Sequence, residues 1–116
     1  MSTAIELRAQ IERRTHVDAC FRWRDRHGIK HDPAKMDTRH VFNTLKMIWN
    51  NMVPEYYRVG FNVRLYSFGP SYTREYMVQA VYQLGHELSK RVLTSEQLRL
   101  LRQMYSYFSN VSALLT

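Results

Sequence analysis

The chain has 116 residues, of which 45% are hydrophobic and 13% aromatic, so we expect one ordered domain and not a disordered chain. Its formal charge of +7, from 17 Lys+Arg against 10 Asp+Glu, indicates either an anionic partner or a basic surface without a function. Because there is no apolar run of about 18 residues and only one cysteine, we expect no membrane span, no secretion and no intrachain disulfide.

The first third of the chain is basic. Residues 3–14 are expected to form a helix, although the apolar stripe is narrow. Around Phe21–Arg24 aromatic residues and arginines alternate, which suits either a short strand with one wet face or a helix with its aromatic side inward; both interpretations stay open. Residues 28–36 are expected to be a connection. The candidate ligand contacts in this segment are Arg13, Arg14, Arg22, Trp23, Arg24 and Arg26.

The strongest helical pattern lies between Asp37 and Pro54. Asp37 is the expected N-cap, and Pro54 ends the pattern because the residue before a proline avoids the helical region. Lys46 and Asn50 are expected on the outer, polar surface. The apolar residues that recur on one face are Val41, Leu45, Ile48, Trp49 and Met52.

Residues 61–68 alternate between apolar and polar side chains and are bounded by glycines. Phe61, Val63 and Leu65 are expected on one face and Asn62, Arg64 and Tyr66 on the other, which predicts a strand. The Phe21 region or another copy of the chain would supply its partner strand.

Two further helices are expected toward the C-terminus. Residues 71–91 form one, capped by Ser71 or Thr73, in which Gly85 either weakens the helix or marks close packing. Thr94 and Gln97 form a capping box that opens the other. That last helix has two apolar stripes: Leu98, Leu101, Tyr105 and Phe108, and then Leu100, Met104, Tyr107 and Val111. The second stripe predicts a homo-oligomer, unless the helix is buried on both sides within one chain.

Together these patterns predict an α+β fold, mainly helical, with about four helices and a small antiparallel sheet. We expect a single domain over residues 1–116, with a basic N-terminal segment (1–35) and a core region (36–116). The core is expected to centre on Leu45, Ile48, Trp49, Met52, Leu84, Leu88, Leu101 and Tyr105.

Catalytic signatures are missing from the sequence. There is no nucleophile motif around Cys20 or any serine, no Walker-type loop and no paired carboxylates, so we expect a protein that is not an enzyme and uses no cofactor. The spacing of His16, Cys20, His27 and His31 is compatible with zinc, but the interval between the pairs is short. We therefore expect no metal, ordinary surface histidines and a buried Cys20.

An anionic ligand is the interpretation that the basic residues favour. Arginines outnumber lysines by 13 to 4, and the guanidinium group suits bidentate contacts to phosphate. Arg39 and His40 lie in the first turn of the central helix, where free N–H groups attract anions. Tyrosines and arginines also gather between residues 56 and 76, where the rings either stack on bases or are simply half-buried. The ligand-binding candidates are Arg39, His40, Arg58, Arg64, Tyr66, Tyr72 and Arg74.

The stretch Thr38–Asn51, TRHVFNTLKMIWNN, followed by Pro54, resembles a family of small tailed-bacteriophage proteins. The segments at 64–70, 72–77 and 87–91 fit the same pattern, so the resemblance covers about residues 36–108. It implies a setting, the cytoplasm of an infected bacterium, and no particular activity or functional residue.

Two classes of function follow from this setting and from the charge. The first is an accessory protein that counters host defence by binding an anionic nucleotide signal or a defence nucleoprotein. The second is a DNA- or RNA-binding accessory or regulatory protein. The first is favoured because the arginines are spread along the chain and no nucleic-acid-binding motif occurs.

Overall fold

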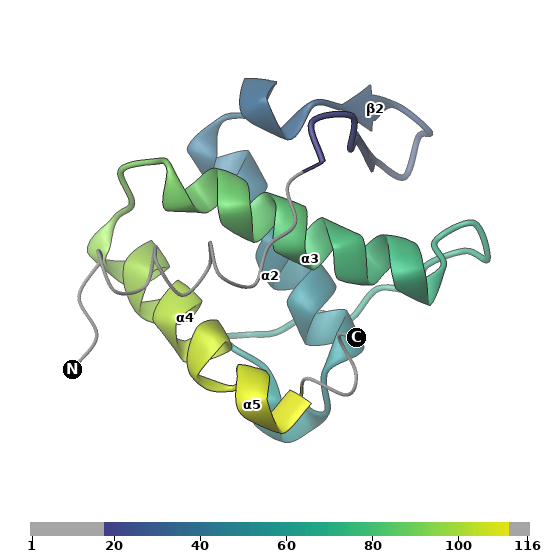
Figure 1. Cartoon of the computed structure of the whole chain (residues 1–116). Coiled ribbons are helices and arrows are strands. Elements are labelled where there is room, and N and C mark those ends of the chain that lie inside the picture. The colour runs from purple at the N-terminus through teal and green to yellow at the C-terminus, as the bar shows by residue number, and fades with distance from the viewer. Residues whose placement is uncertain (1–17, 112–116) are drawn as a thin grey trace.

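The fold of this computed structural model is described for residues 18–111, apart from the side chain of Ser109. It is α+β and mostly helical, with one two-stranded antiparallel sheet (Figure 1). These residues contain three long helices, α2, α3 and α4, where about four helices were expected. The remaining expected helix, at residues 3–14, lies outside the described residues.

The sheet is a short hairpin near the start of the described chain. Strands β1 (Trp23–Arg24) and β2 (Lys30–His31) pair with Trp23 opposite His31. Gly28 closes the turn with φ of 80°, a left-handed conformation that glycine adopts without steric cost. Of the two interpretations left open for Phe21–Arg24, the strand is therefore confirmed. A 3-10 helix, η1 (Pro33–Lys35), follows directly.

Helix α2 (Thr38–Met52) begins and ends where its sequence predicted. The Asp37 carboxylate accepts a hydrogen bond from the His40 N–H (2.8 Å), and Val53 is the C-cap just before Pro54. Its apolar face is buried as expected, except that Met52 is only partly buried. Asn50 was expected on the outer surface, which is wrong: its side chain is 3% exposed.

Helices α3 (Arg74–Ser89) and α4 (Ser95–Ser106) complete the core, and a one-turn helix, α5 (Phe108–Val111), follows. Figure 1 shows α3 crossing in front of α2 and α4 running beside them. Thr73 caps α3, and Thr94 with Gln97 forms the expected capping box of α4. A Cβ at Gly85 would collide with the Tyr105 hydroxyl, so this glycine allows α3 and α4 to approach closely.

Both apolar stripes of the last helical region are buried within the chain, except that Leu98 and Tyr107 are only partly buried. Leu100 is 3% exposed and Met104 1% exposed, although they belong to the stripe from which a homo-oligomer was predicted. The alternative, a helix covered on two sides, therefore accounts for that stripe. Oligomerisation remains a prediction without support from this helix.

The predicted strand at residues 61–68 is wrong. This segment is an irregular loop between η2 (Glu55–Tyr57) and α3, and the apolar residues that were expected to share one face of a strand are exposed. Phe61 is 89% exposed and Leu65 53% exposed. A strand needs a neighbouring strand to pair with, and alternation of side chains does not supply one. The sheet consists of β1 and β2, and neither of them pairs with this loop.

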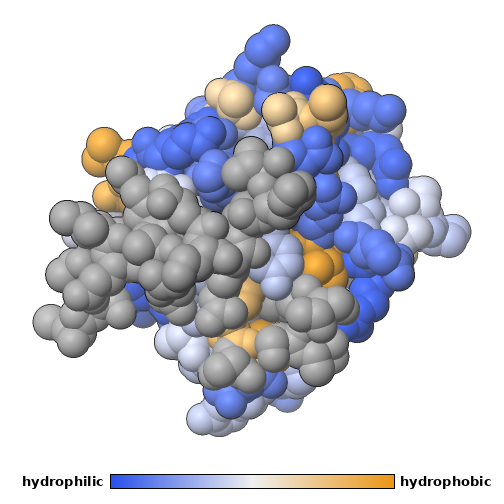
Figure 2. All heavy atoms as spheres, viewed as in Figure 1, coloured by the Kyte–Doolittle hydropathy of each residue, from blue (hydrophilic) through white to orange (hydrophobic). Residues whose placement is uncertain are grey.

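The buried core links the hairpin, α2, α3 and the C-terminal helices. In Figure 2, hydrophilic residues dominate the visible face outside the grey atoms, and hydrophobic residues appear as separate patches. No helix among residues 18–111 is long and apolar enough to cross a bilayer. The fully buried large side chains are Trp49, Phe108, Leu45, Ile48, Leu84, Leu88, Leu101, Met104, Val41 and Val59.

Candidate functional site

One face of α2 forms the floor of a pocket of about 400 Å³. Asn43, Lys46, Met47 and Asn50 line it, and their spacing of i, i+3, i+4 and i+7 places them on one side of a helix. The opposite wall is the loop from Val59 to Tyr66. We call this space, between α2 and the following loop, the α2–loop pocket.

Two adjacent asparagines of α2 hold that loop in place. The Asn50 amide donates to the Val59 carbonyl (2.9 Å) and accepts from the Val59 N–H (2.8 Å). The Asn51 side chain accepts from the Tyr66 N–H (2.8 Å) and donates to the Met47 carbonyl (2.6 Å). The two ends of the pocket wall are thus fixed to one turn of a buried helix, which makes the pocket a preformed site.

The loop enters the pocket through a turn of unusual backbone conformation. Gly60 has φ of 92° and Asn62 has φ of 52°, both left-handed. Asparagine tolerates this conformation better than other non-glycine residues. Between them Phe61 projects into solvent, 89% exposed. A Cβ on Gly60 would lie 3.4 Å from Lys46 Cδ, so the turn passes close to the Lys46 side chain.

The charge of the α2–loop pocket is positive. Lys46 and Arg64 line it, and none of the residues that line it carries a carboxylate. Within residues 18–111 neither cation forms an ion pair. The lining also includes the amides of Asn43 and Asn62 and the half-exposed ring of Tyr66. Cations, amides and aromatic rings together suit an anion that bears a planar ring.

A second group of aromatic residues and arginine lies where the hairpin meets α3. We call Phe21, Trp23, Arg24, Tyr72 and Tyr76 the hairpin cluster. The Tyr76 hydroxyl donates to the Arg22 carbonyl (2.7 Å) and accepts from the Arg24 N–H (2.8 Å). The Tyr72 hydroxyl lies within hydrogen-bond distance of the carbonyls of Arg24 (2.9 Å) and Asp25 (2.7 Å). These tyrosines therefore attach the hairpin to α3.

The rings of the hairpin cluster stack on each other and on Arg24. Trp23 and Tyr76 are nearly parallel, 5.8 Å apart and inclined by 9°. The Arg24 guanidinium lies 4.7 Å from the Tyr72 ring centroid and 5.1 Å from that of Tyr76, and it donates to the Ser71 carbonyl (2.6 Å). Burial raises the pKa of the Tyr76 hydroxyl above its ordinary value. Trp23 is 3% exposed, so its ring is not on the surface.

Histidines gather at a shallower hollow beside the start of α2. His31 Nε2 lies 2.8 Å from the Asp25 carboxylate, and the rings of His31 and His40 meet edge to face at 5.5 Å. The hydrogen bond from His31 is the main cause that holds the pKa of Asp25 below its ordinary value, and the N–H groups of Ile29 and His27 add to it. Lys30, Asp32, Lys35 and Asp37 also line this hollow, so its charge is mixed.

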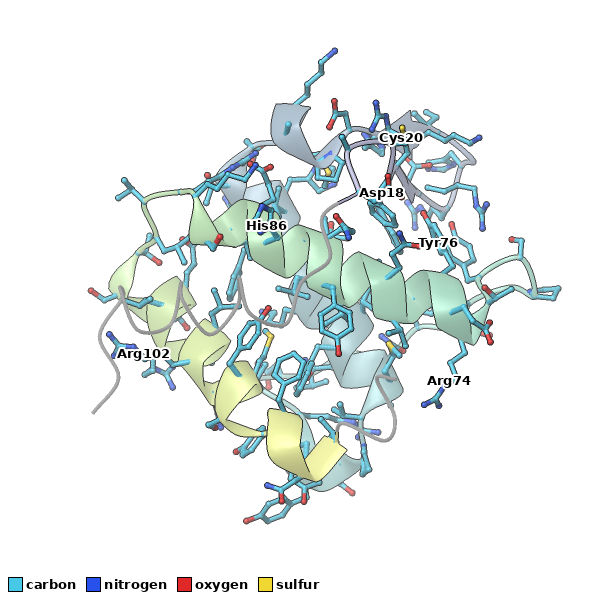
Figure 3. All side chains as sticks on the ribbon, viewed as in Figure 1. Asp18, Cys20, Arg74, Tyr76, His86 and Arg102 are labelled. Carbon is cyan, nitrogen blue, oxygen red and sulfur yellow. The ribbon has the colours of Figure 1, made fainter. Side chains whose placement is uncertain are left out.

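The other predicted contacts are dispersed over the surface. Arg39 is exposed on α2, and Arg58 is half-buried after η2. Figure 3 shows Arg74 projecting from the first turn of α3 away from the hairpin, whereas Tyr76 lies on the hairpin side. Arg22 and Arg26 are exposed on the hairpin, and Arg22 lies 3.9 Å from Asp32. Arg13 and Arg14 lie outside the described residues.

The residues weighed for zinc do not gather in the described part of the chain. Between residues 18 and 111 there is no group of three or more His, Cys, Asp or Glu side chains placed to hold a metal ion. Cys20 was expected to be buried, which is wrong, because it is exposed. His16 lies outside the described residues.

Of the predicted ligand contacts, Arg64 and Tyr66 meet in the α2–loop pocket, whereas Trp23, Arg24 and Tyr72 meet in the hairpin cluster. The pocket lining also includes Lys46, which was expected on a solvated helix face, and Phe61, which was expected in a strand. The signal that was missed is the Asn50-Asn51 pair in the last turn of α2. Adjacent amides near a helix C-terminus are well placed to bind the backbone of the loop that follows.

Comparison with protein-family models, with curated proteins and with solved structures gave no match.

Proposed function

We propose that this protein binds, without chemical conversion, a small phosphate-bearing ligand that carries a base-like ring. The observation that carries the proposal is the lining of the α2–loop pocket, which has two cations and exposed aromatic rings and no carboxylate. A volume of about 400 Å³ is within the range of sites for small molecules. In the setting implied by the phage resemblance, such a ligand is a nucleotide signal of host defence, which the protein would sequester.

Each side of the pocket has a separate part in this proposal. Arg64 and Lys46 contact the phosphate, and each charge-assisted contact contributes about 1.5–3 kcal/mol. The ring of the ligand packs against the aromatic side of the loop. Tyr72 and Arg24 are left out of the contact surface, because their polar groups bind the chain itself.

Calorimetric titration with adenosine and guanosine 5′-monophosphates, cyclic dinucleotides and inorganic phosphate tests the proposal. Arg64→Ala should weaken binding of the tightest nucleotide about ten- to a hundredfold. Arg99→Ala is the matched control, because Arg99 is also exposed but lies on α4, outside the pocket lining. Equal effects of the two substitutions, or no binding of any nucleotide, would show that the proposal is wrong.

A nucleic-acid-binding accessory or regulatory protein is the second candidate. It is favoured by the exposed cations that follow one another along the hairpin, η1 and the start of α2: Arg22, Arg26, Lys30, Lys35 and Arg39. Binding of this kind falls steeply with salt, because phosphate contacts release counterions. The test is to titrate a short single-stranded DNA or RNA at several salt concentrations and to plot the logarithm of the binding constant against the logarithm of the salt concentration. Arg26→Ala should lower the slope of this plot by about one unit. A shallow slope that Arg26→Ala does not change would eliminate this candidate.

A further inference from the structure

Phe61 is the most exposed large apolar side chain in the lining of the α2–loop pocket, at 89%. An exposed phenylalanine side chain forgoes the stabilisation that its burial would give. The loop nevertheless holds it out, because the residues on both sides of it, Gly60 and Asn62, are left-handed. This conformation turns the chain away from the extended path that its alternating sequence predicts.

The position of Phe61 is fixed even though its ring is exposed. Val59, two residues earlier, is 1% exposed and bound through both backbone groups to Asn50. Gly60 packs against the Lys46 side chain. The ring therefore projects from an anchored turn next to a cation, and a ligand that meets it loses little loop entropy.

The neighbours of Phe61 select what can cover it. An apolar peptide would bury Lys46 and Arg64 without a counter-charge, at a large desolvation cost. Free phosphate would neutralise the cations and leave the ring exposed. A nucleotide satisfies both groups, because its base presents a planar face to the ring and its phosphate reaches the cations. The amides of Asn43 and Asn62 in the same lining are able to bind the edge of a base.

We infer that Phe61 is the base-stacking and specificity-determining residue of the α2–loop pocket, and that the ligand is a free mono- or dinucleotide recognised by its base as well as its phosphate. This inference rests on the proposed function, because it assigns the ring of the same ligand to one side chain.

The test compares a nucleotide with the same phosphate group without a base. Phe61→Leu, which keeps an apolar side chain but removes the aromatic face, should weaken binding of the tightest nucleoside monophosphate about five- to a hundredfold. It should leave the affinity for ribose 5-phosphate unchanged, whereas Arg64→Ala should weaken both. Phe61→Trp should retain or strengthen nucleotide binding.

The control is Tyr56→Leu, which removes another exposed aromatic side chain, 80% exposed and outside the pocket lining. It should change neither affinity. Because Phe61 is 89% exposed, thermal melting of Phe61→Leu should match that of the wild type, and this measurement checks that the variant is folded. If nucleotides bind and Phe61→Leu leaves their affinity unchanged, the inference is overturned and the proposed function stands. If no nucleotide binds, both are overturned.

Discussion

The hairpin cluster and the α2–loop pocket are built from the same kinds of residue and present them differently. In the cluster, Tyr72 and Tyr76 direct their hydroxyls to hairpin carbonyls, and the Arg24 guanidinium lies over their rings. In the pocket, Phe61 and Arg64 are exposed, and neither has a hydrogen bond or an ion pair within residues 18–111. Composition alone does not separate a structural use of tyrosine and arginine from a binding use.

The two regions differ in which side chains bind the local backbone. The hairpin is two residues per strand, too short to be stable alone, so its carbonyls and N–H groups depend on side chains from α3. The pocket loop is instead held at its two ends, where Asn50 binds Val59 and Asn51 accepts from the Tyr66 N–H, so its aromatic and basic side chains are not used to hold it. Tyrosine and arginine side chains are thus used to hold the backbone of the hairpin, and the corresponding side chains of the pocket loop stay exposed because Asn50 and Asn51 hold that loop.

Trp23→Ala should have the largest effect and should act on stability alone. Trp23 is 3% exposed and stacks on Tyr76, and truncation of a buried aromatic residue costs about 3–5 kcal/mol. Urea unfolding followed by circular dichroism measures the loss. Nucleotide affinity of the folded fraction should be unchanged, because the α2–loop pocket is lined by other elements. A loss well under 1 kcal/mol, or weaker nucleotide binding by the folded variant, would remove the distinction between the two regions.

Asn50→Ala should affect stability and binding together. Val59 is buried, so its N–H and carbonyl would both lose their partners, at about 1–3 kcal/mol for each group that water does not reach. The loop would then no longer be held over α2, and nucleotide affinity should fall as well. Asn43→Ala is the control, because Asn43 lies in the same pocket floor but is exposed and, within residues 18–111, has no hydrogen bond to the loop. It should leave stability within about 0.5 kcal/mol of the wild type.

The helical part of this fold follows from the sequence because its signals are local. Asp37 and Thr94 cap the helices that they precede, and Pro54 marks the end of α2. The 61–68 loop was mispredicted because strand formation requires a neighbouring strand, and alternation specifies only which side chains would share a face. Gly60 and Asn62 bend this loop away from an extended path, but their left-handed φ angles cannot be predicted from the sequence.

The candidate site was predicted only in part for a related reason. Arg64, Tyr66, Tyr72 and Arg74 are close in sequence and were expected to act together, but only Arg64 and Tyr66 line the same pocket. Tyr72 contacts the hairpin, 47 and 48 residues away along the chain, and Arg64 faces α2. Such long-range partners are decided by tertiary packing, which neither spacing nor composition specifies.

Tyr76→Phe should have a smaller effect than either substitution above. It removes one hydroxyl that bonds both the Arg22 carbonyl and the Arg24 N–H, at the edge of the hairpin where water replaces part of the loss. The expected cost is about 1 kcal/mol, with the ring stacking kept. Hydrogen exchange of the hairpin amides measures it locally, and nucleotide affinity should not change. Unaltered exchange at Arg24 would mean that the tyrosine hydroxyl does not hold the hairpin.

Acidification should loosen the hairpin and leave the α2–loop pocket intact, and this is the smallest effect because Asp25 is partly exposed. The pKa of Asp25 is held below its ordinary value of 3.8, first by the hydrogen bond from His31. A lowered pKa in the folded state gives stability that is present above the ordinary pKa and is lost as the pH falls through the folded-state pKa. Asp25→Asn keeps an acceptor for the N–H groups of His27 and Ile29 but does not titrate.

The measurement is the urea midpoint at neutral pH and at pH about 3, where an unperturbed aspartate is protonated. The wild type should lose more stability between the two conditions than Asp25→Asn does, because only the wild type loses a charged partner for His31. Glu55→Gln is the matched control, since Glu55 is an exposed carboxylate without an ion pair in residues 18–111. If Asp25→Asn and Glu55→Gln alter the pH dependence equally, the Asp25–His31 contact does not contribute to hairpin stability, and the cluster of tyrosines alone holds that region on α3.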